Sequence, residues 1–595
     1  MPHLLSREDC YESHPLLRGH GNSLSTSKRI LETLRASPYS TYDMNPLLIA
    51  LIGMGIVVSG ILAFRMHAFL ALILAAFCVS ILTSSSKVLQ YSLNTYAIEV
   101  VSIDGVTVGL KKKPIEGRTS VLRPNAEGDL EIVARGDLSI IGDANGDDAI
   151  PTSITLSDRG IQLKAGDLII HDTQLGAANQ ESKKNWGERI ADGLGSTLTK
   201  IALLIAMASI IGKCLMDSGG AERIVSSIAK AVGEKRLPMA FVGSGFTLSI
   251  PVFFDTVFYL LIPLGKAMRV KTGKNYLLYV LTIIAGGTMA HSLVPPTPGP
   301  LFVAAEMGID IGLMMIGGII VGLFTATAGY WWAKYANSRW EVPLRASEEL
   351  TQEELDAIAN RDESHLPGLT MSLLPILLPV VLMGGATALS MIVAGGDGSG
   401  ALTSLNEIMK ILGNKNIAMT IAAIFAMVLL LRSNTSNKPI KDLVQSALSS
   451  GGIIILITAA GGTFGHVLRQ TGIAFTIQDL MPAAQSSLIP LGFFITMLIR
   501  TAQGSSTVAM ITAIGIIAPI IAATDLTYHP IYIALAIGCG SKPISWMNDS
   551  GFWVISKMSG LTEKEMLKTN TIMGIIMATV GLIVCMIGAS VLPLN

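Results

Sequence analysis

The sequence predicts an all-α polytopic membrane protein. It also predicts two inverted repeats, each of five transmembrane helices plus one re-entrant hairpin, and a small inserted β domain. Half of the 595 residues are hydrophobic and 14% are charged, with a mean hydropathy of +0.55. Typical soluble domains carry about 25% charged residues. Apolar runs of about 20 residues, the length that crosses a bilayer, recur along most of the chain. Landmarks of the first half recur in the same order in the second.

The chain begins with a polar segment followed by two apolar spans. Residues 1–43 mix basic and acidic side chains and lack the apolar core and cleavage site of a secretory signal, which predicts a polar tail. Residues 44–86 hold the first two membrane spans, at about 46–64 and 66–83.

Residues 87–185 differ in kind and predict an inserted, extracytoplasmic β-rich domain. Short stretches bounded by Gly, Asp and Asn are typical of strands. They lie at 96–103, 129–134, 137–141 and 167–172. The loop from Asp143 to Asp148 resembles the start of a calcium loop. Because Ile154 stands where the bidentate Glu would be, an acidic hairpin turn is favoured.

The remaining chain is divided into the rest of the first repeat (186–335), a charged cytoplasmic linker (336–368) and the second repeat (369–595). The linker contains a capping-box pattern at Thr351 and Glu354. The predicted spans lie at 196–216, 241–264 (interrupted at 249–255), 276–300, 312–333, 369–394, 416–432, 447–466, 488–522 (interrupted), 530–545 and 571–592.

The span that ends in Gly286–Pro300 contains four prolines in its last six residues. Each proline removes a backbone donor and clashes with the preceding turn, so the helix must unwind. Unwound backbone at membrane depth survives only inside the protein or beside a wet cavity. The freed backbone groups, together with His291, Ser292 and Thr297, predict a binding site for a polar ligand.

An internal repeat relates the two halves. The pair Gly212 and Gly219 recurs 253 positions later, and the stretch 286–299 recurs 252 positions later as 538–551. Both halves carry an interrupted apolar segment between these landmarks.

Loop charges predict the topology. If the two interrupted segments are re-entrant hairpins, the loops rich in Lys and Arg lie on one face, the positive-inside pattern. These loops lie at 217–238, 265–275, 334–368, 433–446 and 556–569, whereas the opposite loops at 301–311 and 523–529 have no Lys or Arg. Lys410, Lys415 and Arg469 fall on the opposite face and weaken this pattern. Five crossings per half make the repeats inverted and place the amino terminus and the β insert outside. Inverted repeats with broken helices are typical of secondary transporters.

The broken segments should meet at the repeat interface and form the substrate site. Helix amino termini that follow a break favour a carboxylate, so the expected ligand is a small hydroxylated anion. The alternative for each small residue is close helix packing. The predicted substrate-binding residues are Ser249, His291, Ser292, Thr297, Gly299, Gly504, Ser505, Ser506, Thr507, Asn548 and Ser550.

Asp255 and Asp549 are acids inside apolar segments, where burial of a charge is costly, and are therefore candidates for proton coupling. The alternative is a structural acid paired with Arg500 or Lys542. His291 could bind substrate, relay the proton or be a neutral residue satisfied by backbone. The sequence predicts no catalytic constellation, no metal site, no cofactor and no nucleic-acid partner.

These motifs together resemble the gluconate permease (gluconate:proton symporter) family of the ion-transporter superfamily. The matching stretches are 211–223, 251–255, 291–300, 500–509 and 548–553. The resemblance covers 44–84 and 186–595. It implies proton-coupled uptake of gluconate or a related sugar acid across the cytoplasmic (inner) membrane. The superfamily implies a hairpin-containing transport domain on a scaffold, often dimeric, so a homodimer is expected.

Two positions of the expected site differ from the family pattern, in which His is common where this chain has Thr297 and Trp546. The family pattern also has no counterpart to the tail or the β insert. Two other interpretations remain: a sodium-coupled carboxylate carrier, and a transporter-like receptor that senses through the insert.

Overall fold

The structure, a computed structural model, describes residues 44–594 with gaps. The gaps are 65, 105–106, 111–113, 126–128, 141–149, 157–161, 234–235, 346–365, 395–399, 434–438, 474–487, 523, 525 and 548. The polar tail, the acidic turn at Asp143–Asp148, the capping box at Thr351 and the candidate Asn548 therefore lie outside the described residues.

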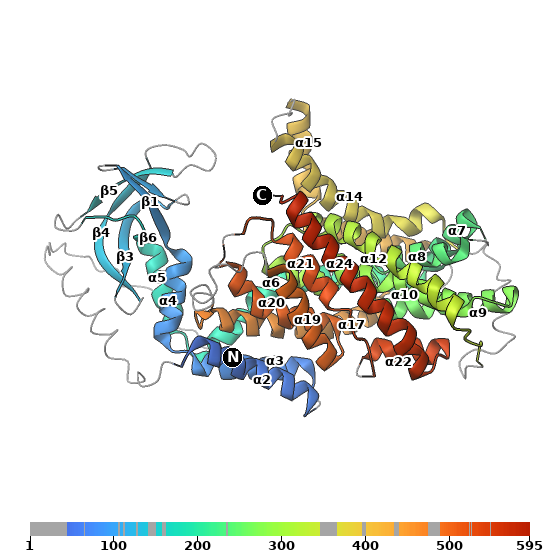
Figure 1. Cartoon of the computed structure of the whole chain (residues 1–595). Helices are drawn as coiled ribbons and strands as arrows, with labels where there is room; N and C mark the ends of the chain where they lie inside the picture. Colours follow the sequence, from blue (N-terminus) through green and yellow to red (C-terminus); the bar gives the residue numbers. More distant parts are fainter. Residues whose placement is uncertain are drawn as a thin grey trace, which may run out of the picture. The chain divides into compact units, whose positions relative to one another are not determined.

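The described chain is mainly helical (Figure 1). The helices before the linker are α2 (Pro46–Leu62), α3 (Ala68–Leu82), α4 (Ser85–Tyr96), α5 (Asp172–Lys183), α6 (Trp186–Asp217), α7 (Gly220–Val232), α8 (Leu237–Leu248), α9 (Phe254–Thr272), α10 (Tyr276–Leu293), α11 (Pro298–Glu306) and α12 (Ile311–Arg339). Those after it are α14 (Leu369–Ala394), α15 (Gly400–Leu412), α16 (Lys415–Arg432), α17 (Ile440–Arg469), α19 (Leu488–Gln503), α20 (Ser506–Ala522), α21 (Ile531–Gly540), α22 (Ser550–Ser559), α23 (Glu563–Met566), the π-helical turn η3 (Leu567–Thr571) and α24 (Ile572–Val591).

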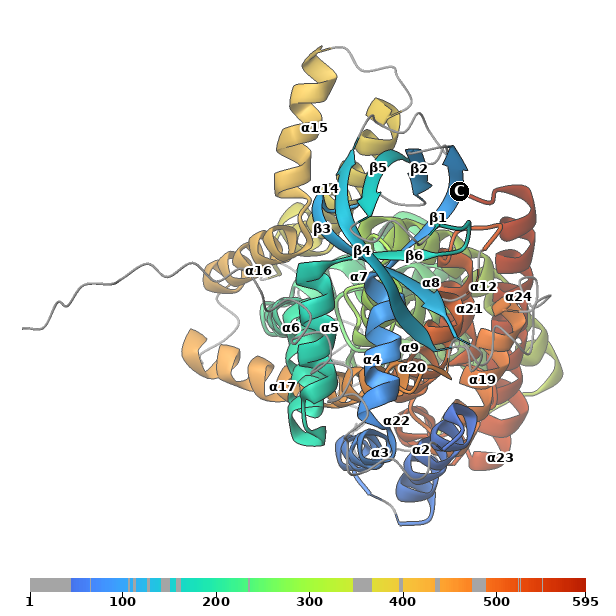
Figure 2. The same ribbon diagram turned by 90° about the vertical axis from the view of Figure 1, so that its left-hand side faces the viewer.

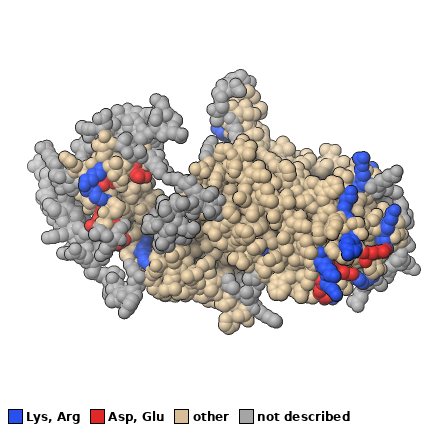
Figure 3. Space-filling model, viewed as in Figure 1, with Lys and Arg blue, Asp and Glu red and all other residues tan. Residues whose placement is uncertain are grey.

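Seven spans in the described chain are long and apolar enough to cross a membrane, or eight if α3 and α4, which meet at a 97° bend, count as one. One of the seven is α10 together with α11. Shorter apolar helices, among them α8, α19, α20 and α21, accompany them. The 12 residues of α8 reach only about 18 Å, less than the roughly 30 Å of a hydrocarbon core. The face in Figure 3 shows a broad uncharged surface over the helical part, with charged side chains gathered where α7 and α9 lie.

Several segments expected as loops contain helical residues in the structure: α11 extends to Glu306 within 301–311, and α23 lies within 556–569. The basic segment around 217–238 contains the helix α7, bounded by Gly219 and Gly233, which have φ of 74° and 77°. Ile224 and Val225 on α7 are buried. The helix forms because its apolar side chains repeat at helical spacing and pack inward while its basic residues stay outside.

Six strands form a closed antiparallel barrel between α4 and α5, in the order β1-β2-β5-β4-β3-β6 (Figure 2). They are β1 (Ile98–Asp104), β2 (Thr107–Leu110), β3 (Gly117–Pro124), β4 (Leu130–Ile140), β5 (Ile150–Leu156) and β6 (Leu168–His171). The stretches 129–134 and 137–141, expected as separate strands, form the single strand β4. It stays extended because Arg135 and Gly136 pair with Ser120 and Thr119 of β3.

We expect Asp167→Asn to lower the free energy of unfolding of the barrel by about 1–3 kcal/mol. The Asp167 side chain, 3% exposed, accepts hydrogen bonds from Arg123 Nε at 2.7 Å, from Arg123 Nη2 at 2.8 Å and from the Lys164 amide at 2.8 Å. The bond to Asp167 raises the pKa of Arg123. The change would be measured by heating the purified protein and using protease cleavage within the barrel as the readout of unfolding. Asp137→Asn, at an exposed position of β4, is the control, and equal stability of the two variants would contradict the prediction.

The two halves share one order of elements, in which helices are separated by breaks. The first half runs in the order α8, break, α9, α10, break, α11 and α12. The second half runs in the order α19, break, α20, α21, break, α22 and, after α23 and η3, α24. α8 packs on α10 as α19 packs on α21, and α11 contacts α20 while α22 contacts α9. At Gly286 a Cβ would lie 2.2 Å from the Val242 carbonyl oxygen, so only glycine allows α10 to approach α8 this closely. The packing brings the breaks of both halves together.

Candidate functional site

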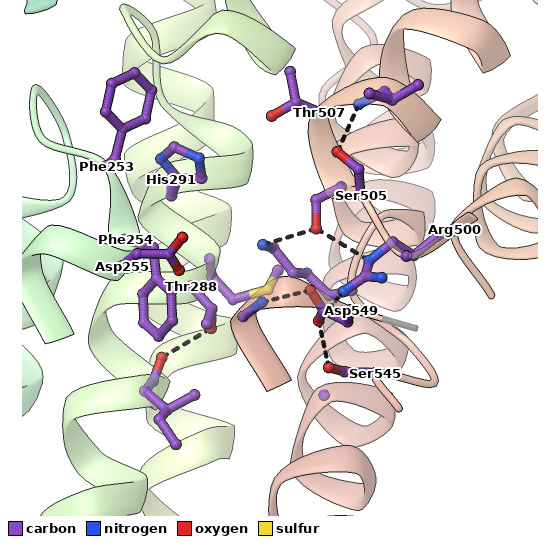
Figure 4. A pocket seen from close by; sticks show the side chains of 18 of the residues that line it. Phe253, Phe254, Asp255, Thr288, His291, Arg500, Ser505, Thr507, Ser545 and Asp549 are labelled. Atoms are coloured by element: carbon purple, nitrogen blue, oxygen red, sulfur yellow. Dashed lines mark hydrogen bonds and ion pairs between the residues drawn. The ribbon is translucent and has the colours of Figure 1, made fainter. Parts of the chain in front are cut away.

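A cavity of about 390 Å³ lies where the breaks meet, a volume suited to a small organic molecule. Residues of α9 and α10 form one wall, and residues of α19, α20 and the segment before α22 form the opposite wall (Figure 4). The polar or charged residues that line it are Asp255, Thr288, His291, Thr458, Arg500, Ser505, Ser506, Thr507, Lys542, Ser545, Asp549 and Asn570.

The first-half wall presents polar groups without partners in the described chain. Asp255 lies in the first turn of α9, and its carboxylate makes no hydrogen bond or ion pair with a described residue. The His291 ring meets Phe253 edge to face at 6.0 Å, and its buried Nδ1 has no hydrogen-bond partner among the described residues. These groups are therefore available to a ligand or a proton.

The break between α19 and α20 brings backbone and hydroxyl groups to the opposite wall. Gly504 has φ of 84°, in the region that favours glycine, and turns the chain. The Ser505 hydroxyl accepts a hydrogen bond from the Val508 amide at 3.4 Å. Because the amino terminus of a helix carries partial positive charge, the start of α20 can bind an anion.

Arg500 is buried at the centre of this wall and forms an ion pair through Nη2 with Asp549. Its Nε donates to Ser506 Oγ at 3.2 Å and to the Ser541 carbonyl at 3.1 Å. Its buried Nη1 has no partner among the described residues. Lys542 Nζ donates to the same Ser506 oxygen at 3.3 Å. Two cations therefore lie around one hydroxyl.

Asp549 is held by donors on both carboxylate oxygens. Oδ2 accepts from Arg500 and from Ser545 Oγ, the latter at 2.6 Å, and Oδ1 accepts from the Gly551 amide at 2.9 Å. A Cβ on Gly551 would lie 3.3 Å from Asp549 Oδ1 and 3.8 Å from Asp255 Oδ1. The two acids therefore flank the start of α22 from opposite walls. Asp549 has hydrogen-bond partners, and the Asp255 carboxylate has none within the described part of the chain.

All the charged candidates line the cavity, whereas several of the uncharged candidates do not. Asp255, His291, Arg500, Gly504, Ser505, Ser506, Thr507, Lys542 and Asp549 line it. Ser249, Ser292, Thr297 and Gly299 are buried but do not. The hydroxyl of Thr297 donates to the Val294 carbonyl at 2.7 Å, and a Cβ on Gly299 would lie 2.0 Å from Met510 Cε. The side chain of Ser550 is not described.

Four polar lining residues were not among the predicted site residues: Thr288, Thr458, Ser545 and Asn570. Thr288 lies three residues before His291 on α10, so helical spacing could have indicated it. Thr458 lies in the unbroken helix α17, where no sequence signal marks it. Asn570 lies in the π-helical turn η3, a conformation frequent at functional sites but not readable from the sequence.

Comparison with known proteins gives the family. The model of the GntP family permeases matches residues 167–591. An uncharacterized permease of Haemophilus influenzae is 35% identical over 379 residues, 63% of this chain and 77% of that protein. A gluconate permease of Pseudomonas aeruginosa is 33% identical over 395 residues, 66% of this chain and 85% of that protein.

A crystal structure of the Alcanivorax borkumensis YdaH transporter is 14% identical and covers 68% of this chain and 88% of that one. Its TM-score is 0.48, a likeness too weak to inform the fold. The family match spans most of the chain and agrees with its apolar spans. This chain therefore belongs to the GntP permease family and is a multi-pass membrane transport protein.

Proposed function

We propose that this permease takes up gluconate, or a closely related small hydroxylated carboxylate, across the cytoplasmic membrane together with a proton. The observation that carries the proposal is the cavity itself, in which two cations and a helix amino terminus face an acid without a partner in the described chain. Relatives in Pseudomonas aeruginosa and Bacillus subtilis carry the name gluconate permease, which supports the choice of substrate.

The carboxylate of the substrate binds on the second-half wall. Nη1 of Arg500 and Nζ of Lys542 supply charged donors, and charge-assisted hydrogen bonds are roughly twice as strong as neutral ones. The amides at the start of α20 add to the positive potential. Ser505, Thr507 and His291 are placed to bond the hydroxyls of the substrate.

Asp255 is the better candidate of the two acids for proton coupling. With Arg500 and Lys542 as cations and Asp549 as an anion, the charges lining the cavity sum to +1 when Asp255 is protonated and to 0 when it is ionised. A monocarboxylate therefore binds more favourably when Asp255 holds a proton. By linkage, the bound anion raises proton affinity in turn. Asp549 already accepts from three donors, so its protonation would break an ion pair with Arg500.

The proposal includes inverted repeats and a defined orientation. The reciprocal contacts of α11 with α20 and of α22 with α9 support a two-fold relation between the halves. The charged side chains around α7 and α9 support a cytoplasmic location for that end. An extracytoplasmic side for the residues before α6 rests on the loop charges of the sequence alone. A homodimer is inferred from the superfamily resemblance alone.

Transport by the purified protein in liposomes tests the proposal. Labelled gluconate should accumulate under an inward proton gradient, and a protonophore should abolish the accumulation. A sodium gradient without a proton gradient should give none. Accumulation driven by sodium would replace the proton as the coupling ion. Failure to carry gluconate, glycerate or any related acid under either gradient would instead favour a receptor that senses through the barrel.

A further inference from the structure

The hydroxyl of Ser506 lies between the two cations of the cavity and has all of its hydrogen bonds taken. It accepts from Arg500 Nε at 3.2 Å and from Lys542 Nζ at 3.3 Å, and it donates to the Ser541 carbonyl at 3.0 Å. A serine hydroxyl offers one donor and two acceptor positions. No hydrogen-bonding capacity is left for a substrate.

Asp549 also holds the guanidinium of Arg500 in place, through an ion pair with Nη2. The guanidinium presents Nε to Ser506 and Ser541 and Nη2 to Asp549. The edge that a guanidinium normally offers to a carboxylate in a bidentate pair is therefore occupied by the protein. Of its three nitrogens, only Nη1 has no partner within the described chain.

We propose that Ser506 is a positioning residue that holds Arg500 and Lys542 together as one carboxylate-binding unit and does not itself contact the substrate. The inference rests on the proposed function and deepens it. Since Nη1 is the nitrogen of Arg500 that has no partner in the described chain, the carboxylate is shared between this nitrogen and the ammonium of Lys542. Ser506 sets the separation between them.

The hydroxyls of Ser505 and Thr507, on either side of Ser506, keep hydrogen-bonding capacity for a substrate. Among the described residues the Ser505 hydroxyl makes only one long hydrogen bond, accepted from the Val508 amide at 3.4 Å, and its own proton has no acceptor there. The hydroxyl of Thr507 makes no hydrogen bond to a described residue. Both line the cavity. Recognition of the substrate hydroxyls therefore falls to Ser505 and Thr507, while Ser506 acts through the cations.

A series of gluconates that each lack one hydroxyl separates the two roles. Their inhibition constants against labelled gluconate uptake are measured for the wild type, Ser506→Ala and Ser505→Ala. Ser506→Ala should weaken every member of the series by the same factor, about tenfold or more, because all members share the carboxylate. Ser505→Ala should weaken all members except the one that lacks its partner hydroxyl. Ser506→Thr, which keeps a hydroxyl, should recover most of the loss.

The inference is overturned if one deoxy analogue is insensitive to Ser506→Ala, since Ser506 would then bond that hydroxyl. It is also overturned if Ser506→Ala leaves all the constants unchanged. Ser506→Cys, whose thiol is a weak acceptor, serves as a second variant should the alanine form fail to fold, and the same outcomes apply. If the wild type neither binds nor carries gluconate, the proposed function itself fails, and that result is distinct from both.

Discussion

Asp255→Asn is expected to reduce accumulation of gluconate driven by a proton gradient by tenfold or more, while exchange of internal for external gluconate continues. Asparagine has the shape of a protonated aspartate and cannot titrate. The charges lining the cavity then sum to +1 at every pH, so the substrate still binds but its binding no longer depends on a proton. Uptake and exchange, measured in liposomes between pH 5 and pH 8, would show the two effects.

The matched control is Asp549→Asn. This change removes the anionic partner of Arg500, and it replaces by an NH2 donor one of the two oxygens that accept from Ser545 and from the Gly551 amide. We therefore expect it to impair exchange as well as accumulation, because it disturbs the site that holds the carboxylate. If Asp255→Asn keeps the pH dependence of the wild type, Asp255 is not the coupling group. If only Asp549→Asn loses that dependence, the coupling belongs to Asp549.

Arg500→Lys is expected to raise the KM for gluconate by about tenfold to a hundredfold, with a smaller effect on kcat. Lysine keeps the charge but lacks the planar fork that serves Ser506, Ser541 and Asp549 at the same time. The single ammonium of lysine has three donors at one point, so it cannot reach Ser506, Ser541, Asp549 and a substrate carboxylate at the same time. Initial rates of uptake at a saturating proton gradient give KM and kcat separately.

Arg469→Lys is the corresponding control outside the cavity. Arg469 pairs with Glu306, whose side chain is 3% exposed, against 12% for Asp549 in the pair with Arg500, so the acid of the control pair is the more buried of the two. The conservative replacement of Arg469 should lower thermal stability without raising KM. Equal KM values for Arg500→Lys and the wild type would show that Arg500 has a structural role only.

The breaks in the helices could be predicted from the sequence because their causes are local. Pro295–Pro300 cannot continue a helix whatever surrounds it, and Gly504 marks a turn by its lack of a side chain. The acids and cations of the cavity could be singled out for a similar reason, since a charged residue inside an apolar run is unusual wherever it occurs. These signals predicted nine of the residues that line the cavity.

The sequence match between the two halves is a limited guide to the cavity. Thr297 and Asp549 occupy matching positions, 252 residues apart, and each precedes the helix that follows a break. Asp549 lines the cavity, whereas the Thr297 hydroxyl turns back to the Val294 carbonyl. Equivalent places in a repeat therefore do not give equivalent roles when the side chains face different neighbours.

The sequence by itself determined that the chain is a membrane protein of broken helices and which charged residues those breaks carry. Hydropathy, proline and glycine act over one or two helical turns, so they can be interpreted without a fold. Only the tertiary structure decided that Arg500 pairs with Asp549 and not with Asp255, that Ser506 joins the two cations, and that Thr458 and Asn570 reach the cavity. Such pairings depend on how each helix is rotated about its axis and packed on its neighbours, a property of the whole fold.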